Sequence, residues 1–125
     1  MRKSVLLEHV PPVLVLQLKR FSFDALQRTP VKIDARVHYP KRLTLAPQHL
    51  SSDLQDQVGG AVQYELRAAV LHHGAAATGG HYTCVCRDDF AQWRHFDDAK
   101  VSAVSEEQAL GHGSRVYLLL YTLLQ

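Results

Sequence analysis

The 125-residue sequence has little cysteine, no long apolar run and no strong excess of either charge. Its only two cysteines, Cys84 and Cys86, are separated by one residue, so a bridge between them would be strained. A disulfide framework is therefore excluded, and reduced thiols favour a cytoplasmic or nuclear protein. The apolar stretch Val116 to Leu124 is far shorter than the roughly 20 residues of a membrane helix. The apolar residues Val5 to Leu7 are too few for a signal peptide, so we expect no membrane partner.

Charge and composition point to an ordinary globular domain. No run of lysine and arginine exceeds two residues and the net charge is +2, which does not favour nucleic acid as a partner. Hydrophobic residues make up 46% of the chain and charged residues 21%, so a disordered chain is not expected. The length leaves room for one domain, which we take as residues 1–125.

Period-two alternation of apolar residues predicts several β-strands. Val13 to Phe23 is apolar on both faces at first, which predicts a strand in the middle of a sheet. Lys32 to Tyr39 alternates cleanly and predicts a half-buried strand that Pro40 stops. Four more strands are predicted, over Tyr64 to His72, His81 to Arg87, Trp93 to Asp97 and Val116 to Leu123.

The remaining segments predict loops and short helices. Leu43 to Gln57 is polar and predicts a loop with a helical turn, and the small residues of Gly74 to Gly80 predict a flexible loop or tight turn. Ser105 to Leu110 opens with a capping-box pattern, Ser-x-x-Gln, which predicts a short helix. The expected fold is α+β, with a mainly antiparallel sheet and one or two short helices.

His81 is a candidate general base. Gly79 and Gly80 directly precede it, and glycines let another stretch of backbone approach closely because they carry no Cβ. A histidine that starts a strand beside such a loop is well placed to exchange protons. A structural histidine is the commoner case, so this motif does not establish a site by itself.

Asp97 and Asp98 are candidate partners of this histidine. A carboxylate can accept a hydrogen bond from the imidazole N–H, which fixes the tautomer and stabilises the imidazolium. The two aspartates alternate along a strand, so one of them is expected to face His81. Taken alone, the pair is better explained as a solvated acidic turn.

Four motifs resemble those of the ubiquitin-specific proteases, a family of ubiquitin carboxyl-terminal hydrolases, and they follow one another along the chain in the order that the family shows. They span nearly the whole chain, from Val10 to Leu123. The run that contains His-His-Gly and Ala-Thr-Gly-Gly-His-Tyr-Thr most resembles the branch around ubiquitin-specific protease ten. The four motifs are Pro11 to Phe21, the histidine box within Tyr64 to Arg87, Trp93 to Val101 and Val116 to Tyr121.

The resemblance implies the palm part of a papain-like catalytic domain and a thiol-dependent deubiquitinase. Such an enzyme hydrolyses the isopeptide or peptide bond after the terminal glycine of ubiquitin, through a thioester with a cysteine. His81 matches the general base, Asp97 the residue that orients it and Asp98 an assisting neighbour. Gly79, Gly80 and Tyr82 match residues that line the channel for the ubiquitin tail. The implied partners are ubiquitin and ubiquitinated proteins, with no cofactor and no metal.

The sequence departs from the family at the nucleophile. The family's cysteine box lies N-terminal to the first motif, and neither that box nor the paired Cys-x-x-Cys zinc knuckles of many members occurs here. Cys84 and Cys86 follow His81 by three and five residues, about 10 and 16 Å along a strand and on its opposite face. We therefore expect neither to be the nucleophile. The chain would supply the base and its orienting aspartate to a polypeptide that carries the N-terminal half, or it would be a catalytically inactive ubiquitin-binding or regulatory fragment.

A metal site is the alternative from a different class. A His-His pair, one further histidine and a Cys-x-Cys pair supply enough ligands for zinc. Their spacing matches none of the usual zinc motifs. Strand alternation would also divide these side chains between two faces of the sheet. The ligands would be drawn from His72, His73, His81, Cys84 and Cys86.

Overall fold

The computed structural model describes residues 3–74 and 80–124. Neither α-helix in this described part approaches the length and apolarity needed to cross a bilayer. The elements within it are β1 (Val13–Gln17), β2 (Phe21–Asp24), β3 (Thr29–Lys32), β4 (Arg42–Leu45), a 3₁₀ helix (Pro47–His49), α1 (Ser52–Val58), β5 (Val62–His73), β6 (His81–Arg87), β7 (Trp93–Asp97), β8 (Lys100–Val104), α2 (Glu106–Ala109) and β9 (Val116–Leu123).

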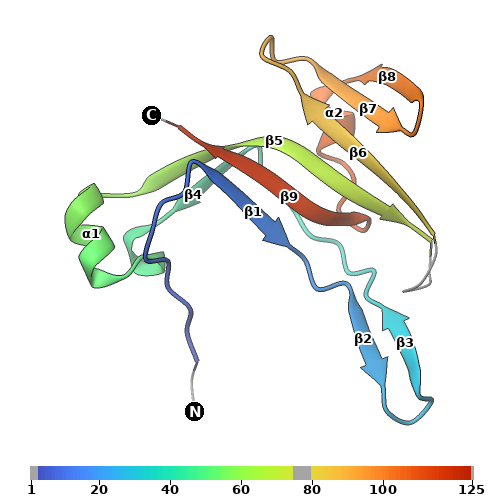
Figure 1. Ribbon diagram of the computed structural model, residues 1–125, viewed down its shortest axis with the longest axis horizontal. Helices are drawn as coiled ribbons and strands as arrows, with labels where there is room; N and C mark the ends of the chain where they lie inside the picture. Colours follow the sequence, from blue (N-terminus) through green and yellow to red (C-terminus); the bar gives the residue numbers. More distant parts are fainter. Residues whose placement is uncertain (1–2, 75–79, 125) are drawn as a thin grey trace.

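Seven of these strands form one antiparallel sheet in the order β1-β9-β5-β6-β7-β8, with β4 also paired to β5. The long strand β5 is central: β9 runs along one of its edges, and β4 and β6 pair with successive parts of the other. The start, middle and end of the chain therefore lie side by side in β1, β5 and β9 (Figure 1). The expected α+β fold with a mainly antiparallel sheet is confirmed.

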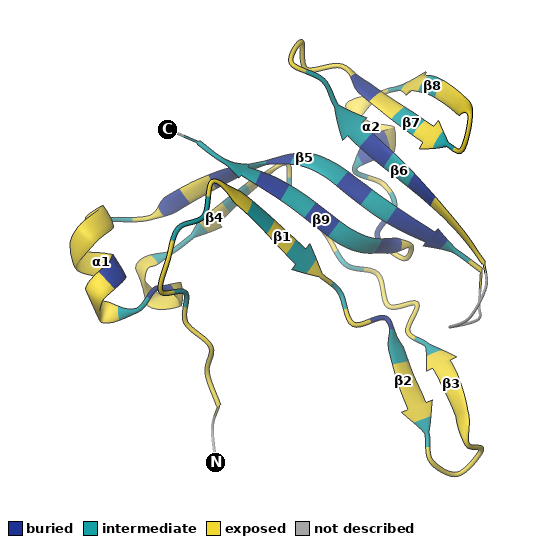
Figure 2. Ribbon diagram, viewed as in Figure 1, coloured by how far each residue is buried: buried dark blue, intermediate teal, exposed yellow. Residues whose placement is uncertain are grey.

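The hydrophobic core lies on one face of this sheet. Alternate residues of β5, β6 and β9 are buried, and Figure 2 shows them as dark blue bands along these strands. Tyr39 closes the core near α2, where its hydroxyl donates to Ala109 O at 2.7 Å and accepts from His112 N at 3.0 Å. The other face, here named the open sheet face, carries exposed or half-buried apolar residues: Val13, Val15, Val70, Phe96, Val101, Leu118 and Leu120.

Strands β2 and β3 form a separate two-stranded ribbon that projects from the sheet (Figure 1). Its turn is closed by Asp24, whose Oδ1 accepts from Leu26 N at 2.9 Å and Gln27 N at 3.2 Å. Phe23 and Leu26 are both exposed on the ribbon.

Arg20 explains why two sequence-based predictions were wrong. Val13 to Phe23 is not one central strand: β1 is at the sheet edge, and the chain leaves the sheet before β2. The buried Arg20 guanidinium donates to Val116 O at 2.9 Å, Gly113 O at 2.6 Å and Ile33 O at 3.3 Å, and also to Ala35 O. Ile33 O and Ala35 O belong to the segment Lys32 to Tyr39, and here a side chain satisfies them instead of a strand partner. β3 ends at Lys32, and the strand predicted over Lys32 to Tyr39 does not form.

The other predictions agree more closely. β5, β6, β7, β9 and α2 lie where the sequence placed them, and Ser105 makes the expected capping box with Gln108. The segment 43–57 is more regular than predicted, because β4 pairs with β5 and α1 begins at an N-cap, Ser51, whose side chain accepts from Leu54 N at 3.3 Å. β8 was not predicted.

Candidate catalytic site

His81 and Asp97 come together at one end of the β6–β7 pair. His81 begins β6 and Asp97 ends β7, and the pairing of Cys84 with Phe96 places both on one face of the sheet. His81 Nε2 lies 2.5 Å from Asp97 Oδ1. The sequence left open which aspartate faces the histidine, and the structure places Asp97 there.

The pair is electrostatically coupled and open to solvent, with side chains that are 46% and 41% exposed. The hydrogen bond that Asp97 accepts raises the pKa of His81, burial opposes this rise, and the charges of Asp97 and Asp98 add to it. The same hydrogen bond lowers the pKa of Asp97. Because Nε2 is bonded to Asp97, Nδ1 is the ring nitrogen that can exchange a proton with a reacting group.

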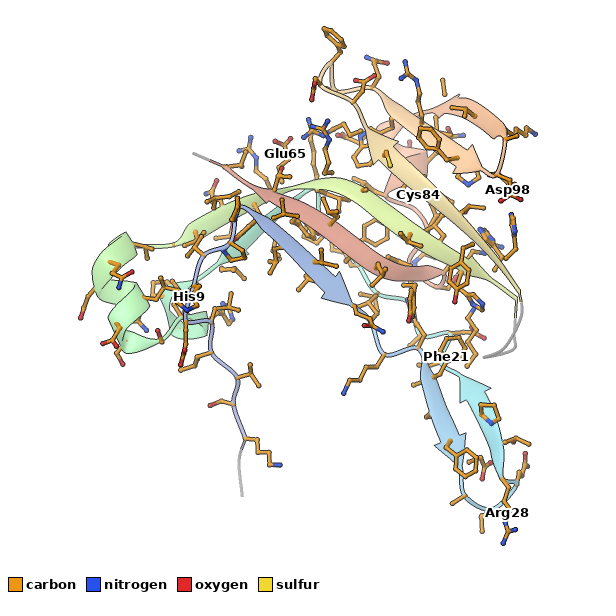
Figure 3. The ribbon with its side chains drawn as sticks, in the orientation of Figure 1. His9, Phe21, Arg28, Glu65, Cys84 and Asp98 are labelled. Carbon is orange, nitrogen blue, oxygen red and sulfur yellow. The ribbon has the colours of Figure 1, made fainter. Side chains whose placement is uncertain are left out.

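Asp98 is the first residue of the turn between β7 and β8, with a positive φ of 51° that aspartate tolerates better than most residues. Figure 3 labels it where β7 ends. Ligand atoms of His81, Asp97 and Asp98 all lie within 4.8 Å of one another. Among the residues that the structure describes, these three form the one group of acidic, histidine or cysteine side chains that lie close enough together to share a cation.

Gly80, which directly precedes β6, packs closely against the end of β5. Its φ is +89°, and a Cβ there would lie 2.6 Å from His73 O and 2.8 Å from His72 Nε2. Both the backbone conformation and the lack of space demand glycine, as the sequence predicted. Gly79, the other glycine of the motif, lies outside the described residues.

Tyr82 points to the face opposite His81. Its ring lies 4.8 Å from the ring of His72 and 6.0 Å from that of Tyr117, measured between centroids, and His72 in turn contacts Phe21 at 5.5 Å. Tyr82 is half exposed, so it forms the outer surface of an aromatic group at the base of the β2–β3 ribbon. The structure therefore separates Tyr82 from the His81–Asp97 pair.

The five residues of the alternative metal site do not converge. His73 and His81 share one face, where His73 Nε2 lies 2.8 Å from Thr83 Oγ1. Strand alternation places His72, Cys84 and Cys86 on the other face. The same alternation directs both thiols away from His81.

Lys32 was missed by the sequence analysis. Its ammonium donates to Gly74 O at 2.6 Å and His72 O at 3.3 Å, and its side chain is only 6% exposed. It thus joins the base of the ribbon to the end of β5, close to the glycine loop. No local pattern predicts this contact, because the partners are about 40 residues apart in the chain.

His95 and His112, to which no role was assigned from the sequence, lie next to each other in the structure. Their rings stack with centroids 6.5 Å apart, and both line a cavity of about 340 Å³ with Val104, Gln108 and Gly111. Burial and the nearby positive groups His95 and Arg115 lower the pKa of His112. The neutral form of His112 is therefore favoured beside the site.

The whole chain is similar to known ubiquitin hydrolases. The family model for ubiquitin carboxyl-terminal hydrolase matches residues 2–121. The chain is 41% identical to "Probable ubiquitin carboxyl-terminal hydrolase 3" of Schizosaccharomyces pombe, covering 96% of this chain and 26% of that protein. It is 37% identical to ubiquitin carboxyl-terminal hydrolase 10 of Xenopus tropicalis, covering 95% of this chain and 15% of that protein.

A solved structure shows the same fold. The SAGA Ubp8/Sgf11/Sus1/Sgf73 DUB module bound to ubiquitin aldehyde contains a chain that superposes with a TM-score of 0.81 at 36% identity. The match covers 94% of this chain and 26% of that one. This chain thus spans about a quarter or less of the relatives it matches. By its family match, its relatives and its fold, the chain belongs to the ubiquitin carboxyl-terminal hydrolase family.

Proposed function

We propose that this chain supplies the general base, His81, and its orienting residue, Asp97, to a thiol-dependent ubiquitin hydrolase. The observation that carries the proposal is the 2.5 Å contact between His81 Nε2 and Asp97 Oδ1 in a chain of this family. Asp98 assists by adding negative charge next to the imidazole. In this proposal, residues 1–125 are the C-terminal palm portion of a catalytic domain.

The chemistry follows from the free ring nitrogen. His81 Nδ1 takes the proton of a cysteine thiol, and the thiolate attacks the carbonyl carbon of ubiquitin's terminal glycine. The imidazolium then protonates the leaving lysine amine, which leaves a thioester that water hydrolyses with His81 again as base. Asp97 holds the reactive tautomer and stabilises the imidazolium, consistent with the raised pKa of His81.

The nucleophile in this proposal comes from a polypeptide that carries the N-terminal half. Support comes from the strand geometry, since Cys84 and Cys86 lie on the face of β6 opposite His81. A thiol must lie within about 3 Å of the base to transfer its proton, which the opposite face does not permit. The nucleophile must therefore approach from the face of β6 and β7 that carries His81 and Asp97.

The proposed substrate is a ubiquitin tail that enters beside the glycine loop. In this proposal Gly79 and Gly80 line one end of the channel, and Tyr82 bounds it on its outer side. The tightly packed Gly80 supports this role, because it places the end of the loop against β5, two residues from Tyr82. Ubiquitin-bound relatives of the same fold give further support.

A turnover assay combined with a binding assay tests the proposal. The purified chain is incubated with a fluorogenic ubiquitin C-terminal substrate, and ubiquitin is titrated into it by calorimetry. The expected result is no turnover at any concentration of the chain. Turnover that disappears in His81→Ala would show a nucleophile within this chain and overturn the half-site proposal.

The calorimetric arm separates the two remaining possibilities. Binding of ubiquitin without turnover, lost on Tyr82→Ala at the channel but kept in Phe90→Ala, an exposed residue beyond the other end of β6, would support a ubiquitin-binding module. Absence of binding would mean that the substrate contacts come from other parts of the catalytic domain, and that this chain contributes only the base and its orienting residue. Circular dichroism of each variant checks that the chain remains folded.

A further inference from the structure

Two thiols face each other on the side of β6 opposite His81. Cys84 and Cys86 are two residues apart on one strand, so their side chains point the same way. Their Sγ atoms are 3.3 Å apart, and both thiols are free and half-buried. Figure 3 labels Cys84 on β6. The proposed hydrolysis gives neither thiol a role.

We propose that Cys84 and Cys86 form a reversible redox site, which a hydroperoxide converts from a dithiol to an intramolecular disulfide. Two residues of extended strand span about 6.6–6.8 Å, at the upper end of the roughly 4.4–6.8 Å between Cα atoms that a disulfide bridges. The bridge therefore closes with some strain in β6. Strained disulfides are more readily reduced, which suits a labile bridge and not a structural one.

The surroundings make the two thiols unequal. The pKa of Cys86 is lowered to about 7, mainly by the hydrogen bond with Cys84 and also by the positive charge of Arg67, against an opposing effect of burial. The same contact and burial raise the pKa of Cys84. Arg67 comes from the neighbouring strand β5, where its guanidinium is 2.8 Å from Asp89 Oδ1. Cys86 is thus the thiol that reacts first.

In the first step, the Cys86 thiolate attacks the terminal oxygen of the hydroperoxide. An S–O bond forms, the O–O bond breaks, and the departing oxygen takes up a proton and leaves as water or an alcohol. Cys86 is then a sulfenic acid. Its negative charge is gone, and with it one of the causes that raised the pKa of Cys84, after the hydrogen bond to Cys86 and burial.

In the second step, the Cys84 sulfur attacks the Cys86 sulfur. The S–S bond forms, the S–O bond breaks, and the hydroxide leaves as water with the Cys84 proton. The two thiols lose two protons and two electrons in all, and the peroxide takes up both and is reduced. A small thiol such as dithiothreitol reverses the bridge by exchange.

Intact-mass analysis of the purified chain, treated at pH 7 with one equivalent of hydrogen peroxide, tests the inference. The expected product is a monomer lighter by two hydrogen atoms, with Cys84 and Cys86 linked and dithiothreitol restoring the starting mass. Disulfide-linked dimers, stable sulfinic acid without a bridge, or no reaction with intact thiols would each overturn the proposal. A titration with phenylarsine oxide, which bridges two close thiols with loss of water, should give one arsenic per chain.

Single variants test the order of the two steps. Cys84→Ser should stop at the Cys86 sulfenic acid, which dimedone labels, and Cys86→Ser should react at least about tenfold more slowly. Dimedone labelling of Cys84 in preference to Cys86 would contradict the proposal. Arg67→Gln should slow the reaction of the otherwise unchanged chain and the matched Arg67→Lys should not. Circular dichroism before treatment checks the fold of each variant.

Discussion

His81 Nε2 lies 2.5 Å from Asp97 Oδ1, a contact between the first residue of β6 and the last residue of β7. Each residue is the largest cause of the other's pKa shift. The two side chains are thus one electrostatic unit. Its properties are measurable in the chain alone, without substrate and without a nucleophile.

We predict that Asp97→Asn lowers the pKa of His81 toward the ordinary histidine value. The variant removes the charge that accepts the imidazole hydrogen bond, and the burial that opposes it remains. The measurement is an NMR titration of the histidine ring protons. Asp98→Asn is the matched control and should lower the pKa less, because Asp98 contributes only through its charge. An unchanged His81 pKa in Asp97→Asn would contradict the coupling.

The same pair makes stability depend on pH. The raised pKa of His81 gives stability that is full below the unfolded histidine value, near 6.5, and is lost as pH rises through the folded value. The lowered pKa of Asp97 gives stability that is present above the unfolded value, near 3.8, and is lost as pH falls through the folded value. Urea denaturation of the native chain and Asp97→Asn should therefore differ most between these two values. A constant difference from pH 4 to pH 9 would contradict this.

Gly80→Ala is expected to destabilise the fold by more than about 1–2 kcal/mol, the usual cost of a Cβ in a left-handed conformation. The added Cβ would also lie 2.6 Å from the carbonyl oxygen of His73, which belongs to backbone and cannot move aside freely. Gly60→Ala is the matched control, because nothing lies within 4 Å of its Cβ position. Equal midpoints of urea unfolding for the two variants would show that Gly80 is not constrained as described.

Arg20→Met is expected to cost about 3 kcal/mol or more in the free energy of unfolding. The buried guanidinium donates to four backbone carbonyls, and each carbonyl left without a donor costs about 1–3 kcal/mol when buried. Arg94→Met, which removes an exposed ion pair with Asp88, should cost less than about 1 kcal/mol. Comparable losses in the two variants would contradict the role assigned to Arg20.

The open sheet face should make the isolated chain self-associate, or should give it a low midpoint temperature of thermal unfolding. Val15 is exposed in the middle of β1, and exposed apolar faces of sheets promote association. Sedimentation of Val15→Lys should show less association, and the control Val5→Lys, outside the sheet, should show no change. A monomeric native chain that unfolds cooperatively at high temperature would contradict this prediction.

The sequence predicted those strands whose alternation is strict and whose buried face packs on the core. The bounds of β6, β7 and β9 match the predicted ranges for this reason. β8 was missed because its two valines, Val101 and Val104, are three residues apart and fall on opposite faces of the strand, so no period-two alternation marks it. Lys32 to Tyr39 was mistaken for a strand because the sequence does not reveal that Arg20, which precedes it by a dozen residues, satisfies its carbonyls.

The candidate site was only partly predictable from the residues. Glycine before His81 indicated a close approach, which Gly80 makes, but the choice of Asp97 over Asp98 came from the family resemblance. Contacts such as that of Lys32 with Gly74 depend on the tertiary fold and leave no local pattern. The proximity of the two thiols was visible in the Cys-x-Cys spacing, but their unequal pKa values depend on Arg67 from a neighbouring strand.

The most direct test of the account is the activity of a chimaera in which this chain replaces the matching segment of the Schizosaccharomyces pombe relative. That relative, at 41% identity, would supply the remainder of the catalytic domain. The rate of hydrolysis of a fluorogenic ubiquitin substrate should fall about 10²–10⁴-fold in His81→Ala, fall substantially in Asp97→Ala, and stay unchanged in the exposed His38→Ala. An active chimaera whose rate is unaffected by His81→Ala would contradict the assignment of His81 as the general base.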